Sequence, residues 1–249
     1  MMQRIRSLGF GLFGGLFLAA FLGAASPALA QAAAGGERFE VKSIKAVRPT
    51  LVNTLTALQQ RDLARAKAAF EAYDSGWNGI EFYINTRNRD MYQVLEHGYQ
   101  DKIAKALAEP SPDIAALTAD AQGMLSKYDE TIALVEKAAP LNPLYDEIAR
   151  LRIVRANLRE VNPALKAGNI AKARKSFMAF DDNWDSIEDL IKARSQDAYV
   201  GIEKGMIEIE KALMPEKPDV AQATALVNAV MAKYNVTVTE MIKEARSRP

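Results

Sequence analysis

The sequence predicts an all-α fold, built as a tandem duplication of one antiparallel up-down-up-down four-helix unit. Apolar residues recur at spacings of three and four along most of the chain, and strand signals are nearly absent. A stretch that starts at Trp77 returns at Trp184, 107 positions later, and this register holds without a gap over 47–98 and 154–205. Turns divide each copy into segments of helical length, and short connections between such segments are typical of antiparallel bundles.

The two copies share identical residues at aromatic, acidic and basic positions. The pairs include Arg48/Arg155, Phe70/Phe177, Trp77/Trp184, Ile80/Ile187, Glu81/Glu188, Arg87/Arg194, Asp90/Asp197, Tyr92/Tyr199 and Glu96/Glu203. Self-similarity at a fixed period identifies a repeated structural unit. We therefore place repeat 1 at 43–139 and repeat 2 at 140–249, with Asn142 as a helix cap and Pro143 as the first helical residue. The repeats form either two separate bundles or one shared core.

Turn and cap residues predict the helix boundaries inside each repeat. The turn at 167–169 contains a glycine that ends one helix and an asparagine that starts the next, and Asn88 and Ser195 are placed to cap the third helices. Pro49 and Pro163 fall inside the first helices, so each of these helices is expected to begin late or to kink.

Two further features concern the third helix of each repeat. It ends at the proline turns 109–112 and 215–218, where one residue is gained or lost and the offset becomes 106. Gly98 and Gly205 recur in the middle of the helix, where glycine costs about 1 kcal/mol relative to alanine. Their recurrence predicts a close helix crossing.

Residues 1–30 have the pattern of a secretory signal peptide. Two arginines precede an apolar run over 8–25, and Ala28-Leu29-Ala30 supplies a small-residue cleavage site. The alternative is an uncleaved anchor helix, since the run approaches the roughly 18 to 20 residues that span a bilayer. We expect cleavage after Ala30, a flexible tether at 31–42, and a periplasmic protein with no stable membrane insertion.

Composition excludes several classes of function. The formal net charge is +1, and removal of the signal segment takes away two arginines and no acid, which leaves −1. A near-neutral chain lacks the basic surface of a nucleic-acid-binding protein, so no nucleic-acid partner is expected. The chain has no cysteine, which excludes thiolate metal sites, iron–sulfur clusters and attached c-type haem. It has one histidine, His97, and no phosphate-binding loop or nucleophile elbow, so we expect no enzymatic activity, no haem and no nucleotide.

Glutamates are placed at the edge of the apolar stripe on two neighbouring helices. Glu81 lies four residues after Trp77, and Glu96 lies four residues after Tyr92. The second repeat has the same arrangement, with Glu188 and Glu203. A carboxylate taken out of water costs several kcal/mol unless it is paired, hydrogen-bonded or bound to a cation. Two interpretations therefore stay open.

In the first interpretation the acids belong to ion pairs that tie the helices together. The basic partners would be the recurring arginines, Arg48, Arg87, Arg155 and Arg194. Asp90 and Asp197 would serve only to complement the dipole at a helix N-terminus, which contributes a few tenths to about 1 kcal/mol. The chain would then be a non-catalytic structural or adaptor module that binds a protein partner at the membrane.

In the second interpretation, which gives the function we expect, the acids bind a metal ion that the protein captures or delivers, because helical bundles commonly build metal sites from inward glutamates. The candidate ligands are Glu81, Asp90, Tyr92 and Glu96 in repeat 1, with Glu188, Asp197, Tyr199 and Glu203 in repeat 2. Such oxygen ligands suit a hard cation such as Fe³⁺. The Glu-x-x-His of di-iron bundles is missing, and Lys204 replaces His97 in the second repeat.

The repeated pattern W-x-x-I-E followed by S/N-x-x-x-Y-x-x-I/L-E resembles the helical extracytoplasmic repeats attached to some bacterial permeases of the oxidase-dependent iron permease family. It is present at Trp77–Glu96 and again at Trp184–Glu203. The membrane-spanning part of that family, with its R-E-x-x-E motifs, is absent. The resemblance implies a stand-alone periplasmic module that captures or delivers iron, with an inner-membrane iron permease or another transport component as partner. A weaker likeness, in architecture only, is to imelysin-type periplasmic proteins, whose histidine-containing motif is not found.

Overall fold

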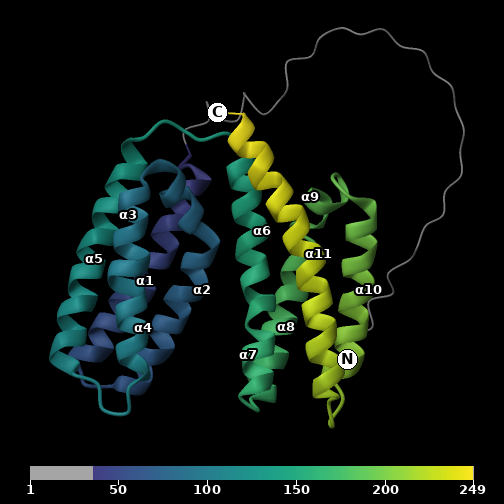
Figure 1. Ribbon diagram of the computed structural model, residues 1–249, viewed down its shortest axis with the longest axis horizontal. Helices are drawn as coiled ribbons and strands as arrows, with labels where there is room; N and C mark the ends of the chain where they lie inside the picture. The colour runs from purple at the N-terminus through teal and green to yellow at the C-terminus, as the bar shows by residue number, and fades with distance from the viewer. Residues whose placement is uncertain (1–35, 249) are drawn as a thin grey trace, which may run out of the picture. The chain divides into compact units, whose positions relative to one another are not determined.

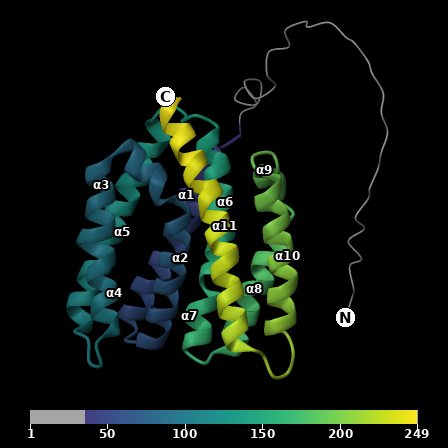
Figure 2. The ribbon, with the colours of Figure 1, turned by 45° about the vertical axis from the view of Figure 1, so that its right-hand side comes forward.

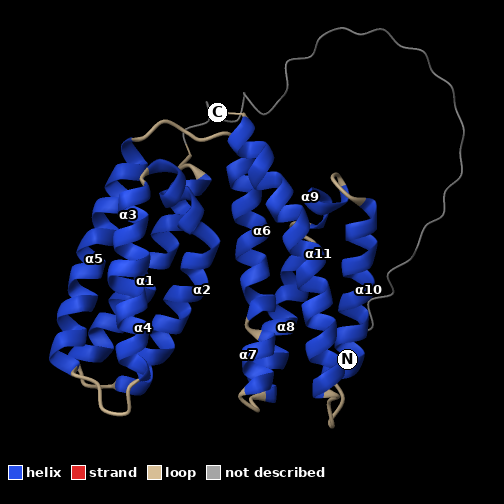
Figure 3. Cartoon of the chain, in the orientation of Figure 1, coloured by secondary structure: helices blue, strands red, loops and turns tan. Residues whose placement is uncertain are grey.

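The computed structural model describes residues 36–248, and within that range all regular structure is helical (Figures 1 and 3). The all-α prediction is therefore confirmed for the described residues. The predicted signal peptide and cleavage site at 1–30 and the first part of the tether lie outside them. From residue 36 onward the chain forms one compact unit. No helix in the described part combines the length and apolar character needed to cross a membrane.

The first half of the described chain contains three long helices and one helix interrupted by a π-helical turn. In order these elements are α1 (Phe39–Gln59), α2 (Leu63–Arg87), α3 (Arg89–Gln93), the π-helix η3 (Val94–Gln100), α4 (Asp101–Ala108) and α5 (Ile114–Lys137). Helix α1 packs against both α2 and α5, and η3 packs against α5. The segments α3, η3 and α4 follow one another along the same path (Figures 1 and 2).

The second half has a similar order of elements with different breaks. Its helices are α6 (Leu144–Arg159), α7 (Val161–Lys166), α8 (Ile170–Trp184), α9 (Glu188–Lys192), α10 (Gln196–Leu213) and α11 (Val220–Ser247). Helix α11 packs against α6 and α10, and α8 packs against α6 and α7. Helix α10 is regular where the first half has the π-helix, whereas α8 and α9 are separate where α2 is continuous.

The two halves share one connected apolar core. Helix α2 packs against α6, and the buried residues of both halves belong to a single cluster. Across this contact the Tyr83 hydroxyl donates to an Asp146 carboxylate oxygen at 2.6 Å, and the Phe82 ring stacks on Tyr145 with centroids 6.0 Å apart. A Cβ added at Gly79 would lie 2.7 Å from the Ile153 side chain, so a larger residue there would force Ile153 to shift.

Helix α1 begins at Phe39, so residues 39–42, which the sequence assigned to the tether, are helical. The reason lies in the side chains of this first turn. Val41 and Ile44 are buried in the core, and Glu40 is buried in an ion pair with Arg87. These contacts stabilise the first two turns of α1.

The two prolines act differently from one another. Helix α1 contains Pro49 well inside its length, so of the two outcomes expected there, a late start or a kink, the late start does not occur. Near Pro163 the chain does break, because α6 ends at Arg159 and α7 starts after Glu160. Arg159 is four residues before Pro163, and a proline ring clashes with the carbonyl at that spacing.

The predicted caps at the third helices and after the turn at 167–169 are confirmed. Each cap side chain accepts a hydrogen bond from the backbone N–H three residues on, in the pairs Asn88–Met91, Asn169–Lys172 and Ser195–Ala198. Gly168 has a φ of +71°, as its C-terminal capping role requires, and Arg61 has a φ of +58° at the equivalent position.

The copies lose register inside η3, and not at the proline turn where the sequence placed the change. Leu95 and Ile202 are both fully buried, 107 positions apart. The next buried residues are Gln100 and Met206, which are 106 positions apart. A π-helical turn accommodates one residue more than an α-helical turn, so η3 absorbs the extra residue and returns the helix to the core register.

The recurring glycines are therefore not equivalent in space. A Cβ added at Gly205 would lie 2.3 Å from Val230, which is the predicted close crossing. A Cβ added at Gly98 would meet only Val94, at 3.9 Å within the same turn, so the close crossing predicted there is wrong. The extra residue lies beside Gly98, which moves this glycine away from the neighbouring helix.

Deletion of Gly98 should leave the protein folded, because it converts the π-helical turn to the α-helical register of the second repeat. The matched deletion of Gly205 should rotate Met206, Ile209 and Leu213 away from the core and cost several kcal/mol. Thermal unfolding followed by circular dichroism measures both. We expect the melting temperature to change by only a few degrees for the first deletion. Equal damage from the two deletions would contradict the assignment of the extra residue to η3.

Candidate functional site

The candidate site of each repeat is centred on a buried tryptophan. Trp77 on α2 and Trp184 on α8 are fully buried. The indole N–H of Trp77 donates to a carboxylate oxygen of Glu96 on η3, and that of Trp184 donates to Glu203 on α10. A buried indole N–H needs an acceptor, since leaving it unpaired costs about 1–3 kcal/mol. Both glutamates thus satisfy a core donor.

The two predicted tyrosines stack on these tryptophans. The Tyr92 ring lies 6.3 Å from that of Trp77, centroid to centroid, with an interplanar angle of 8°. Tyr199 lies on Trp184 at 6.5 Å and 11°. Both tyrosines are half-buried, and Lys192 places its ammonium 5.1 Å from the Tyr199 ring centroid.

A further tyrosine contacts each tryptophan, Tyr128 in the first half and Tyr234 in the second. Tyr128 and Tyr234 have ring centroids 6.3 Å from those of Trp77 and Trp184. Their hydroxyls donate to backbone carbonyls of the first helix of each half, Ile44 at 2.8 Å and Leu151 at 2.7 Å. Burial raises the pKa of both phenols, so they stay protonated and act as donors.

Glu81 pairs with an arginine from the other half of the chain. Its carboxylate accepts from the guanidinium of Arg152 on α6, and the two side chains are 19% and 10% exposed. The Arg152 guanidinium also lies over the Phe82 ring, 5.2 Å from its centroid. Arg152 therefore supplies the counter-charge that Glu81 requires.

The four arginines that recur in the sequence have defined partners of their own. Arg48 bonds to Asp129 at 2.6 and 2.9 Å, Arg87 to Glu40 and to the Ala139 carbonyl, Arg155 to Asn235 at 2.6 Å, and Arg194 to Glu147 at 2.8 Å. The Arg87–Glu40 pair is buried, whereas the Arg48–Asp129 pair is 40% and 45% exposed. Burial, together with the charge of Arg152, lowers the pKa of Arg155 to about 10.

Three other predicted ligands, Asp90, Asp197 and Glu188, lie at the starts of helices. Asp90 and Asp197 are exposed in the first turns of α3 and α10, where an acid complements the helix dipole. Glu188 is half-buried and opens the short helix α9, whereas its counterpart Glu81 lies inside the continuous helix α2. The two repeats therefore do not present their acids in the same way.

The charge of Glu81 affects the pKa values of two other predicted residues, Glu96 and Tyr92. Burial raises the pKa of Glu96, the Trp77 hydrogen bond lowers it, and the charge of Glu81 raises it further. Burial also raises the pKa of Tyr92, with additional contributions from Glu81 and Glu96. Within residues 36–248, however, no three Asp, Glu or His side chains gather so as to hold a metal ion.

A small cavity of about 130 Å³ adjoins this cluster between the two halves. Its lining residues are Glu81, Phe82, Asn85, Thr86, Tyr92, Tyr145, Arg152, Ile242 and Arg246. The sequence singled out Glu81 and Tyr92 but missed Arg152. Lys45 lies 107 positions before Arg152, so both repeats have a basic residue at this position. This recurrence of charge is a signal in the sequence, although the two residues are not identical.

Comparisons with models of protein families, with curated proteins and with solved structures returned no match. The geometry of the chain gives Glu81, Glu96 and Glu203 a hydrogen-bonding partner within the protein.

Replacing Glu96 should separate its hydrogen bond from its charge. In Glu96→Gln the amide oxygen still accepts from Trp77, so stability should change by less than about 1 kcal/mol. In Glu96→Ala the indole loses its acceptor, which should cost about 1–3 kcal/mol. Urea unfolding measures both, and Glu203→Gln and Glu203→Ala repeat the test in the second repeat.

The pH dependence provides a further check on Glu96. Because its pKa is raised in the fold, the cost of its charge is present at neutral pH and disappears as pH falls through that raised pKa. The stability of Glu96→Gln relative to the wild type should therefore be greatest at neutral pH and decline in acid. Equal effects of the Gln and Ala variants at all pH values would contradict the assigned hydrogen bond.

The Glu81–Arg152 pair should couple the two halves energetically. A double-mutant cycle with Glu81→Gln and Arg152→Met should give a coupling of about 1–3 kcal/mol, since both side chains are largely buried. The exposed pair Arg48–Asp129 is the matched control and should give at most about 1 kcal/mol. Urea unfolding measures both cycles, and equal couplings would be inconsistent with a special role for Arg152.

Proposed function

We propose that the chain is a non-catalytic helical adaptor that binds a protein partner through the surface of its bundles. One observation carries this proposal: glutamates predicted as metal ligands meet protein groups. Glu81 pairs with Arg152, Glu96 accepts from Trp77, and Glu203 accepts from Trp184. Because these contacts offset the cost of burying the acids, the fold needs no cation at these positions.

The adaptor is proposed to consist of two copies of one four-helix unit. The supporting observation is that long-range contacts recur at matching positions. The Trp–Glu hydrogen bond recurs after 107 positions, as does the Trp–Tyr stack. The tyrosine-to-carbonyl bonds of Tyr128 and Tyr234 also recur, with donors 106 positions apart because η3 has already absorbed one residue.

The proposed setting is the periplasm, with a membrane transport component such as an iron permease as partner. The signal-peptide pattern at 1–30 supports the location. The resemblance of the two W-x-x-I-E stretches to the extracytoplasmic repeats of iron permeases supports the partner. The adaptor would then contribute a binding surface, while transport is performed by the partner.

Iron binding is the second candidate function, and a specific observation favours it. The charge of Glu81 raises the pKa of both Tyr92 and Glu96, and Glu81 and Tyr92 line the same small cavity. A hard cation placed among them would relieve this repulsion. To bind there it would have to displace the Arg152 guanidinium from Glu81, which makes the site weaker than one built of free carboxylates.

Titration of the mature chain with Fe³⁺, supplied as a soluble chelate, separates the two functions. If the chain is an adaptor, neither the wild type nor Glu81→Gln should take up Fe³⁺ saturably. Iron binding expects saturable uptake that is lost in Glu81→Gln, strengthened in Arg152→Met, and weakened as pH falls because the ligands must lose protons. Saturable uptake with this pattern of variants would overturn the adaptor proposal.

A photo-crosslinking scan tests the binding surface directly. Several apolar side chains are exposed, among them Met178, Val200 and Val236 at 52–59%. Crosslinkers at these positions, in cells that express the full chain, should give one product of defined mass from one face of the protein. Products of equal yield from all faces, or none from any, would contradict a specific partner surface.

A further inference from the structure

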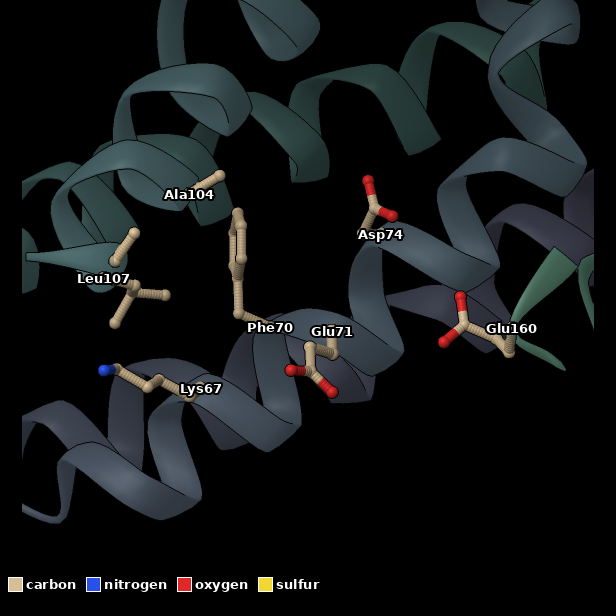
Figure 4. Close-up of a pocket in the computed structure, with 8 residues that line it drawn as sticks. Lys67, Phe70, Glu71, Asp74, Ala104, Leu107 and Glu160 are labelled. Atoms are coloured by element: carbon tan, nitrogen blue, oxygen red, sulfur yellow. The ribbon is translucent and has the colours of Figure 1, made fainter. Parts of the chain in front are cut away.

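A second cavity, separate from the one beside Glu81, has the size of a small-molecule site. It has a volume of about 430 Å³, within the 300–1,000 Å³ typical of such sites. Its lining residues are Lys67, Phe70, Glu71, Asp74, Ala104, Leu107, Ala108 and Glu160. They come from α2, from α4 and from the junction of α6 and α7 (Figure 4).

The cavity has an apolar wall and an acidic wall. In Figure 4 the Phe70 ring lies beside Leu107 and Ala104, while the carboxylates of Asp74 and Glu160 lie toward the other end. Phe70 and Leu107 are each only 5% exposed, so the apolar wall is part of the core surface. A ligand that fits both walls combines a hydrocarbon body with a positive charge.

Two of the three acids of this cavity form ion pairs, whereas Asp74 is hydrogen-bonded to a neutral group. Glu71 and Glu160 share the ammonium of Lys172, at 3.1 and 3.5 Å. Asp74 accepts a neutral hydrogen bond from the Gln100 amide at 2.8 Å. Burial raises the pKa of Asp74, Arg159 lowers it, and the charges of Glu160 and Glu81 raise it. Asp74 is therefore the acid that gains most from an added cation.

Gln100 is the buried partner of Asp74. It is 6% exposed, and within residues 36–248 its amide oxygen is buried without a hydrogen-bond partner. That oxygen is not exposed, and Gln100 is not among the lining residues, so Gln100 contributes to the cavity by holding the Asp74 carboxylate in place. Gln100 reaches Asp74 only because η3 carries one extra residue, and Met206 occupies the matching core position in the second half.

We propose that this cavity binds a small organic ammonium ion, with its charged nitrogen against Asp74 and its hydrocarbon body against Phe70 and Leu107. A bare metal ion does not fit, because it would leave the apolar wall and most of the volume unused. An anion is disfavoured because the three carboxylates of the cavity outnumber the two lysines near them, Lys67 and Lys172. The site belongs to the first repeat, since the second repeat lacks the amide of Gln100. It goes beyond the adaptor proposal and does not depend on it.

The experiment compares two probes of the same shape, 2-phenylethylammonium and the neutral 2-phenylethanol, by NMR titration of the mature chain. The ammonium should bind saturably and at least about tenfold more tightly than the alcohol, which corresponds to about 1.4 kcal/mol. Asp74→Asn keeps the bond from Gln100 and removes the charge, and should weaken ammonium binding by at least about tenfold. The matched variant Asp181→Asn, 107 positions later, should leave binding unchanged.

Two further variants keep the test decisive if Asp74→Asn fails to fold. Asp74→Glu retains the charge and should retain ammonium binding, whereas Leu107→Trp fills the apolar wall and should abolish binding of both probes. Three results would overturn the proposal: no saturable binding of the ammonium, equal affinity for the alcohol, or equal losses in Asp74→Asn and Asp181→Asn. None of these results bears on the adaptor proposal, whose tests use Glu81 and Arg152.

Discussion

The requirement that a buried indole N–H find an acceptor organises each half of this protein. Trp77 and Trp184 are the largest fully buried side chains of the described residues. Each has a single side-chain N–H, which must be hydrogen-bonded inside the core. In both halves the acceptor is a glutamate 19 residues later in the chain, on a different helix from the tryptophan. This bond fixes the rotation of α2 against η3 and of α8 against α10, and the two tyrosines around each indole complete the packing.

Local chemistry made much of the fold predictable from the sequence. The caps at Asn88, Asn169 and Ser195 depend on residues within one turn, so their identity is enough to place the helix starts. The inward orientation of Trp77 follows equally from the spacing of apolar residues along one helix. Features of this kind need no knowledge of what packs opposite.

Long-range pairing was the part that the sequence did not reveal. Arg152 is 71 positions from Glu81, and its side chain reaches that acid because α6 lies against α2. The one-residue change of offset between the repeats was likewise placed at the wrong end of its helix. An extra residue can be absorbed at any of several positions along a helix, and burial of Gln100 against the core decides between them. Both features depend on contacts between helices and not on residue type alone.

The contact between α2 and α6 determines how the molecule comes apart. Tyr83 donates to Asp146 and Phe82 stacks on Tyr145 across it, so loss of either half uncovers large aromatic surface on the other. We therefore expect neither half to fold by itself, despite the sequence repeat. Heating should melt both in one cooperative transition, and a protease that cuts the connection near Pro140 should leave two associated fragments in place of two independent domains.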